Sequence, residues 1–89
     1  MKWRRLRRFK RDFDKLTSQE KDAARAAFRL FQEDSSHNSL RVKGLRGSQG
    51  IWEGHVSKRI VFTFQIDTED REIVYIFRRI GRHDIYENP

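Results

Sequence analysis

The stretch Arg59–Ile66, RIVFTFQI, decides the fold because its two sets of side chains alternate along the chain. Successive side chains of a β-strand point to opposite faces, so positions 60, 62, 64 and 66 share one face, and each is Ile or Phe. Positions 59, 61, 63 and 65 share the other face and carry Arg, Val, Thr and Gln. This period of two predicts a half-buried strand whose apolar face lies against a core.

Three further segments extend this strand pattern. Residues 40–45, LRVKGL, and 51–56, IWEGHV, alternate in the same way, which assigns Trp52 to the core side. Residues 72–80, EIVYIFRRI, are almost continuously apolar, as is typical of a central strand, and Tyr75 is expected to pack within the sheet. DTED, residues 67–70, is the expected hairpin loop, and glycines 44, 47, 50 and 54 are expected at turns or bulges.

The first third of the chain has the period of a helix instead. Phe9, Phe13 and Leu16 recur at i, i+4 and i+7, which places them on one helical face. Thr17 and Glu20 have the spacing of a capping box, so a second, alanine-rich helix is expected to begin there and to end near residues 33–36. Residues 2–8, KWRRLRR, are compatible with a short first strand or with an arm.

These elements predict an α+β fold. An N-terminal helical hairpin packs on a C-terminal antiparallel sheet of about four strands, in one domain that covers residues 1–89. Aromatic residues make up 12% of the chain, and this content favours a folded core over disorder despite 37% charged residues.

Composition limits the classes of function. The chain has 20 Lys and Arg against 13 Asp and Glu, and the resulting charge of +7 favours nucleic acid, an anionic membrane or an acidic protein as partner. It has no cysteine, which excludes disulfides and thiolate metal sites, and its three histidines lack paired metal-ligand spacing. No stretch is long and apolar enough for a signal peptide or a membrane span, so we expect a cytoplasmic protein without membrane contact.

The strand pattern also defines the sheet face that points away from the helices. This face is expected to be polar and open, with a cationic character suited to an RNA backbone. The alternative is that its Lys and Arg side chains are simply solvated, as is ordinary on the wet face of an antiparallel sheet. The C-terminal segment RRIGRHDIYENP, residues 78–89, follows the last strand and can fold over the rim of the same face. The expected polar residues of the face are Arg41, Lys43, Glu53, His55, Arg59, Thr63 and Gln65.

Four short motifs in this order resemble the RelE/ParE superfamily, the toxins of bacterial toxin–antitoxin systems. They are GLRG at 44–47, IWEGHV at 51–56, RIVFTF at 59–64 and IGRHDIY at 80–86, and the resemblance spans about residues 9–86. The resemblance implies the RelE-like microbial RNase fold. It also implies the activity of the RelE-like branch, which cleaves mRNA on the ribosome by attack of the RNA 2′-OH, without a metal ion or other cofactor.

The resemblance also implies roles for residues at matching positions. The catalytic residues would be Glu53 or His55 as general base and His83 as general acid, with Arg59 stabilising charge on the phosphate. Glu53 and His55 replace lysines that are frequent at these positions in RelE itself, so the chemistry is expected to follow the histidine-using relatives. The residues expected to bind RNA are Lys43, Arg46, Arg82 and Tyr86.

The same resemblance implies two macromolecular partners, mRNA on the ribosome and a cognate acidic antitoxin protein, and no small-molecule cofactor. Two other functions remain open at this stage because fold does not fix function. The first is a ParE-like toxin that binds and poisons DNA gyrase, and the second is a non-catalytic RNA-binding relative. A pure gyrase binder would not need the set formed by Glu53, His55, Arg59 and His83.

Overall fold

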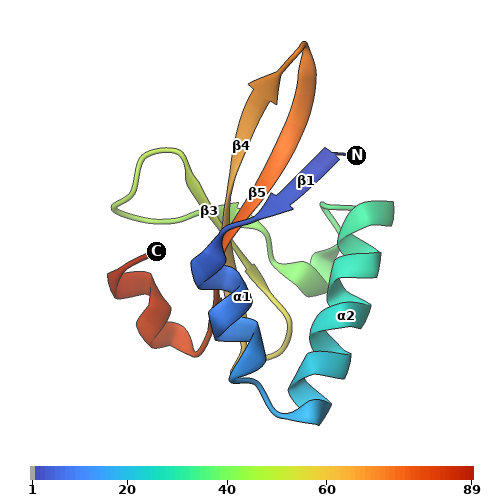
Figure 1. Ribbon diagram of the computed structural model, residues 1–89, viewed down its shortest axis with the longest axis vertical. Helices are drawn as coiled ribbons and strands as arrows, with labels where there is room; N and C mark the ends of the chain where they lie inside the picture. Colours follow the sequence, from blue (N-terminus) through green and yellow to red (C-terminus); the bar gives the residue numbers. More distant parts are fainter. Residues whose placement is uncertain (1) are drawn as a thin grey trace.

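The computed structural model describes residues 2–89, in which two α-helices, five strands and two short 3₁₀ helices follow one another (Figure 1). The helices α1 and α2 lie side by side near the start of the chain, and the long β4–β5 hairpin projects beyond them. In chain order the elements are β1 (Lys2–Arg5), α1 (Arg7–Asp14), α2 (Ser18–Glu33), η1 (Asn38–Leu40), β2 (Lys43–Gly44), β3 (Ile51–His55), β4 (Val61–Glu69), β5 (Glu72–Gly81) and η2 (His83–Glu87).

The strands form one sheet in the order β1-β5-β4-β3-β2. The predicted α+β architecture is confirmed, but the sheet of residues 2–89 has five strands and is mixed. The additional strand is β1, which pairs in parallel with β5, from Lys2 opposite Val74 to Arg5 opposite Phe77. Its four residues are exposed, as expected of an edge strand, and this exposure explains why they show no apolar alternation.

The predicted capping box starts α2. The Glu20 amide donates to the Thr17 hydroxyl at 3.1 Å, and the Thr17 amide donates to the Glu20 carboxylate at 2.9 Å. The hydrogen bond from the Thr17 amide is the main cause that lowers the pKa of Glu20.

Within residues 2–89, no helix is both long enough and apolar enough to cross a bilayer.

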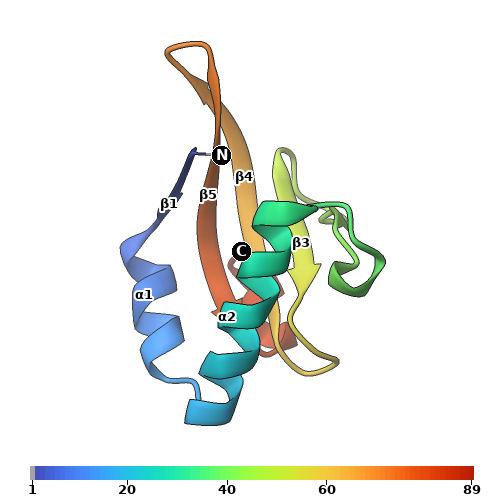
Figure 2. The same cartoon turned by 90° about the vertical axis from the view of Figure 1, so that its right-hand side faces the viewer.

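The hydrophobic core lies between the two α-helices and the sheet, and in Figure 2 α2 lies in front of the sheet while η2 lies behind it. Phe31 of α2 meets Phe62, Phe64 and Phe77 of the sheet with ring centroids 5.2 to 6.1 Å apart. The alternation predicted for 60–66 is confirmed as far as Phe64. Ile66 is 40% exposed because the β4–β5 hairpin extends past the helices.

Four local expectations were wrong. DTED is not a loop: β4 continues to Glu69, and the turn is Asp70–Arg71, whose φ angles of 48° and 67° are those of a tight two-residue hairpin turn. Residues 40–45 form only the two-residue β2, because Arg41 takes a left-handed conformation and turns the chain.

Gly54 lies inside β3 under the Phe62 ring and not at a turn. Trp52 stacks beside Phe64 but stays 37% exposed, because β3 lies near the sheet edge.

A β-bulge in β5 positions two consecutive arginines. Thr63 pairs with Arg79 and Phe64 with Phe77, so Arg78 is an extra residue on that strand. The bulge lets Phe77 and Ile80 both enter the core although their spacing is odd. Arg78 Nε then donates to the carbonyl of Pro89 at 3.1 Å, and Arg79 Nη1 donates to that of Asn88 at 3.1 Å. Both side chains therefore hold the C-terminal segment.

The second face of the sheet is covered, contrary to the expected open face. Ile85 of η2 is buried, and Val61, Thr63 and Glu53 are buried on the strands. The Thr63 hydroxyl donates to the Pro89 carbonyl at 3.0 Å, so residues 83–89 lie across this face. The C-terminal segment was expected at the rim of the face, and its packing over the strands leaves a smaller polar area open at the β3 side.

Candidate active site

A shallow pocket of about 480 Å³ opens between β2, β3 and η2. It lies at the part of the second face that the C-terminal segment leaves uncovered. Its polar side chains include a carboxylate, two imidazoles, a phenol and two cations. The residues that line it are Arg41, Val42, Lys43, Glu53, His55, His83 and Tyr86.

Glu53 is the buried acid of this pocket. It lies on β3, paired with Lys43 on one side and Thr63 on the other, and is only 7% exposed. Its Oε1 accepts a hydrogen bond from the Tyr86 hydroxyl at 3.2 Å and lies 3.7 Å from His55 Nε2, within ion-pairing distance. A buried carboxylate is costly unless it is paired, so these two contacts explain how a charged group is tolerated there.

Two histidines meet in the pocket from different elements. His55 ends β3 and is half-buried, whereas His83 begins η2 and is exposed. Their ring centroids are 6.1 Å apart, and the Tyr86 ring lies 5.6 Å from His83. β5 ends at Gly81 and η2 begins at His83, and η2 places His83 and Tyr86 beside the β3 residues Glu53 and His55.

Tyr86 is held in its neutral form. Partial burial, the negative charge of Glu53 and the hydrogen bond to Glu53 each raise the pKa of its phenol well above the ordinary value. The phenol therefore remains a hydrogen-bond donor to the carboxylate over the whole neutral range. This arrangement fixes the position of Glu53 and, through it, the orientation of His55.

The structure brings together five of the eight residues that the sequence singled out. Lys43, Glu53, His55, His83 and Tyr86 line the pocket. Arg41 lines it too, and sequence reasoning left it out of the site although the strand pattern had placed it on the polar face. The signal that could have found Arg41 is its neighbour Lys43, two residues away.

The three other predicted arginines lie outside the pocket. Arg46 is exposed in the loop between β2 and β3. Arg59 is in the turn before β4, beside the start of α2. Arg82 is exposed next to His83, and its Nη2 lies 3.7 Å from Glu20 Oε2. None of the three lines the pocket in this conformation.

The pocket has the groups needed for proton transfer at an anionic substrate. Two imidazoles lie edge to face in a pocket open to solvent, and histidine is the side chain whose charge changes most readily near neutral pH. Lys43 and Arg41 add positive charge on the β2 side, which favours a phosphate or another anion. A buried carboxylate below His55 can stabilise an imidazolium cation.

The fold of this chain is shared with solved structures of known proteins. Two helices on one face of the sheet and a C-terminal element on the other form the fold of RelE/ParE-superfamily toxins, as the motif resemblance implied. No protein-family model matches the chain, and no curated protein matches it.

Three solved structures illustrate the similarity. The YoeB/ParE toxin from Agrobacterium tumefaciens has a TM-score of 0.73 at 13% identity, covering 93% of this chain and 99% of its own. The E. coli DinJ–YafQ toxin–antitoxin complex has a TM-score of 0.71 at 16% identity, covering 92% and 91%. The RelB–RelE antitoxin–toxin complex from Methanococcus jannaschii has a TM-score of 0.67 at 17% identity, covering 94% and 95%. At these identities, the similarity shows the fold.

Proposed function

We propose that this protein is the toxin of a toxin–antitoxin pair and acts as an endoribonuclease that cleaves mRNA through attack of the RNA 2′-OH. The observation that carries the proposal is the meeting of Glu53, His55, His83 and Tyr86 in one pocket beside Lys43. A protein that only binds has no need for a buried carboxylate paired with a histidine opposite a second histidine. The shared fold with known toxins supports the toxin role.

In the proposed reaction His55 is the general base. Its Nε2 faces Glu53 at 3.7 Å, which leaves Nδ1 to accept the proton of the 2′-OH. The 2′-oxygen then forms a bond to phosphorus, and the positive charge on His55 is stabilised by the Glu53 carboxylate. Burial and the hydrogen bond from Tyr86 favour Glu53 as a positioning residue over Glu53 as the base itself.

His83 is the proposed general acid. It is exposed, and its ring lies 6.1 Å from that of His55, so both imidazoles can reach one phosphodiester in the pocket. As the bond from phosphorus to the 5′-oxygen breaks, His83 donates a proton to that oxygen. The products are a 2′,3′-cyclic phosphate and a 5′-hydroxyl end, and both imidazoles return to their starting states by exchanging protons with water.

Cations around the pocket would hold the RNA backbone. Lys43 and Arg41 line the pocket and are the proposed contacts of the reacting phosphate. Arg46, Arg59 and Arg82 lie outside it and are proposed to contact flanking phosphates. Tyr86 is engaged with Glu53, so its proposed role is to position that group, while its ring edge remains available to a base.

The proposed partners are mRNA on the ribosome and an acidic antitoxin. The shallow pocket holds few groups that could orient a flexible RNA, so a ribosome that fixes the message would supply that orientation. A chain with a charge of +7 favours an acidic partner, and two of the similar structures are toxin–antitoxin complexes. This activity belongs in the cytoplasm, where messages are translated.

The test compares growth and RNA cleavage for two histidine variants. Wild-type protein, His83→Gln and His37→Gln are each induced in a bacterial host, and primer extension maps the 5′ ends of a translated message. His37 is the matched control because it lies before η1, does not line the pocket, and its ring bonds to Ser39. We expect His83→Gln to lose about 10²- to 10⁴-fold in cleavage and to lose toxicity, while His37→Gln stays active.

Two results would count against the proposal. Undiminished cleavage by folded His83→Gln would remove the general acid. Toxicity without any cleavage in the wild type would point to a binding mechanism instead, such as poisoning of DNA gyrase.

A further inference from the structure

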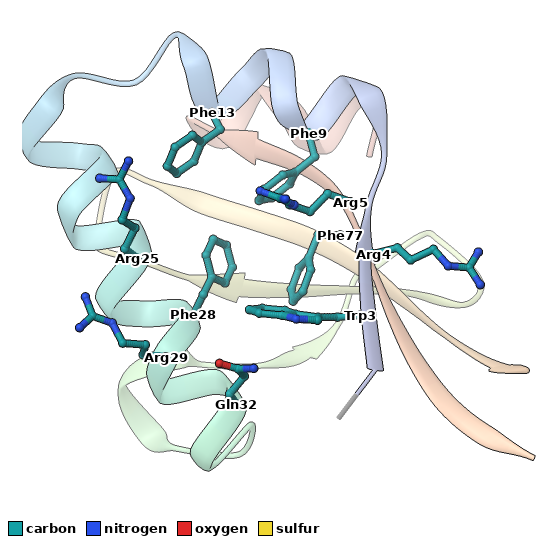
Figure 3. A pocket seen from close by; sticks show the side chains of 10 residues that line it. All are labelled: Trp3, Arg4, Arg5, Phe9, Phe13, Arg25, Phe28, Arg29, Gln32 and Phe77. Atoms are coloured by element: carbon teal, nitrogen blue, oxygen red, sulfur yellow. The ribbon is translucent and has the colours of Figure 1, made fainter.

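A small hollow of about 340 Å³ lies outside the candidate active site, between the start of α2 and the turn that joins β3 to β4. It is distinct from a larger groove of about 790 Å³ between β1, α1 and α2, whose floor is aromatic (Figure 3). The charged side chains that line the small hollow are Glu20, Lys58 and Arg59. The hollow therefore sets one carboxylate among cations.

Glu20 is held in place by the capping box of α2. Its Oε1 accepts a hydrogen bond from the Thr17 amide at 2.9 Å, and its own amide donates to the Thr17 hydroxyl at 3.1 Å. Its other oxygen, Oε2, lies 3.7 Å from Nη2 of Arg82. The Glu20 side chain is 24% exposed and that of Arg82 is 61% exposed. The carboxylate is therefore the fixed member of this ion pair, and the guanidinium is the member that can move.

Glu20 lies beside both chain segments that carry the histidines of the candidate site. Arg82 directly precedes His83, and Arg59 belongs to the turn that follows His55. The capping hydrogen bond lowers the pKa of Glu20 most, and the charges of Arg82 and Arg59 lower it further. The start of α2, the β3–β4 turn and η2 all lie at the end of the molecule opposite the tip of the β4–β5 hairpin (Figures 1 and 2). One carboxylate is thus shared by an arginine from each segment.

We propose that Glu20 is a positioning residue that holds Arg59 and Arg82 outside the candidate active site until a phosphate of RNA takes the place of its carboxylate. Carboxylate and phosphate oxygens accept from a guanidinium in the same forked geometry, so one can replace the other. An ion pair between exposed groups contributes little stability, so the exchange costs little. The inference rests on the proposed function in taking RNA as the ligand and these arginines as contacts of flanking phosphates.

This arrangement accounts for the position of the two arginines. Among residues 2–89, Glu20 supplies the one carboxylate oxygen within 4 Å of Arg82, and none lies this close to Arg59. In the absence of RNA, the guanidinium of Arg82 therefore lies toward α2. An RNA chain in the pocket presents a phosphate on each side of the reacting one, and these phosphates compete with Glu20 for the same cations.

The test measures binding of a labelled single-stranded RNA oligonucleotide that is 2′-O-methylated throughout. Methylation removes the attacking hydroxyl, so binding is measured without cleavage. Fluorescence anisotropy at several salt concentrations compares the wild-type protein with Glu20→Gln, because glutamine at this position still completes a capping box. We expect about two- to fivefold tighter binding by Glu20→Gln, the range that exposed ion pairs usually contribute. The logarithm of its binding constant should also fall more steeply with the logarithm of salt concentration, by up to roughly 0.7 for each arginine released.

A double-mutant cycle identifies the groups through which Glu20 acts. In an Arg59→Gln/Arg82→Gln background, Glu20→Gln should leave RNA binding unchanged. Two matched controls should bind RNA as the wild type does. Glu33→Gln makes the same change of charge at the exposed far end of α2, and Thr17→Ala weakens the cap while keeping the carboxylate.

Three results would overturn the proposal. They are equal tightening in Glu20→Gln and Glu33→Gln, a tightening that persists without both arginines, and unchanged or weaker binding by Glu20→Gln. The wild type supplies a further readout that does not depend on the folding of any variant. The side-chain Nε–Hε NMR signals of Arg59 and Arg82 should shift when the methylated RNA is added, and unmoved signals would also overturn the proposal.

The outcome is separate from that of RNA cleavage. A wild-type protein that binds methylated RNA in the expected pattern but leaves unmodified RNA intact would keep the role of Glu20 and reject the proposed reaction. Cleavage by the wild type, without any change of binding in Glu20→Gln, would reject the role of Glu20 alone.

Discussion

At the scale of single residues, the candidate site depends on one contact between Tyr86 and Glu53. The phenol donates to Oε1 of the buried carboxylate at 3.2 Å, and the same oxygen lies 3.7 Å from His55 Nε2. Tyr86 thus holds the carboxylate in place from within the pocket lining, while His83 is exposed and His55 is half-buried. Strand alternation placed Glu53 and His55 on one face, but it could not show that Glu53 is buried, because a residue from η2 covers it.

The ionisation of Tyr86 tests this contact. Its raised pKa predicts that, in a Tyr75→Phe background, tyrosinate absorbance appears only well above pH 10, the ordinary value for tyrosine. Glu53→Gln removes the negative charge and should bring the ionisation back toward the ordinary range. A midpoint near pH 10 with Glu53 intact would contradict the contact.

The same shift fixes the direction of a stability change. Above pH 10 the unfolded chain loses the Tyr86 proton before the folded chain does. The stabilisation that comes from this difference in pKa is therefore complete below pH 10. It is lost as the pH rises through the native pKa. Urea unfolding of wild type and Tyr86→Phe across this range should therefore show a steeper loss in the wild type.

At the scale of elements, the strands were predictable where alternation is regular and not where one residue breaks it. The bulge at Arg78 cannot be recognised in residues 76–80, IFRRI. Phe77 and Ile80 are three residues apart, and this spacing is also what is expected where a strand ends. The hairpin turn was missed because Asp70 and Arg71 both adopt positive φ, which Arg rarely does. Arg46 and Arg59 were assigned to the site by their positions in the family motifs. Both lie in loops, where no regular spacing of residues predicts the direction of a side chain.

Gly54 of β3 has no room for a side chain. A Cβ built there would lie 2.3 Å from Cζ of Phe62, whose ring is fully buried in the core. Gly54→Ala should therefore destabilise the protein by about 1–3 kcal/mol through overpacking. Urea unfolding monitored by circular dichroism measures this loss.

Gly44 is the control for that substitution, since nothing lies within 4 Å of a Cβ built at that residue. Gly44→Ala should change the free energy of unfolding by less than about 0.5 kcal/mol, as surface substitutions usually do. Equal losses at the two glycines would mean that Phe62 moves aside easily.

At the scale of the whole molecule, the sequence predicted the α+β class, the helical hairpin and five of the six side chains with chemistry in the pocket. Alternation supplied Lys43, Glu53 and His55, and the family resemblance supplied His83 and Tyr86. The covered second face was not predictable, because η2 is short and its burial depends on contacts with distant strands. Thr63 and Arg78, which bond to the Pro89 carbonyl, have no signal of their own in the sequence.

One ion pair joins the two ends of this architecture. Asp12 of α1 accepts from Arg79 Nε at 2.6 Å and from Nη2 at 3.1 Å, and also from the Ile80 amide at 3.2 Å. Arg79 donates in turn to the Asn88 carbonyl, and the hydrogen bond from Arg79 to Asp12 is the main cause that raises the pKa of Arg79. The pair therefore links the N-terminal helix, the last strand and the segment that carries η2.

Breaking this pair should affect both stability and the site. Asp12→Asn leaves a largely buried guanidinium without its counter-charge, so we expect a loss of about 2–3 kcal/mol in the free energy of unfolding, less than for a fully buried pair. Asp22→Asn is the matched control, because Asp22 is 80% exposed in its pair with Arg25 and should lose less than about 1 kcal/mol. Amide hydrogen exchange supplies the second readout: in Asp12→Asn, residues 83–87 should exchange faster than in the wild type, since Arg79 no longer holds the C-terminal segment in a fixed geometry. Unchanged exchange in η2 would show that Arg78 and Thr63 hold that segment without help from α1.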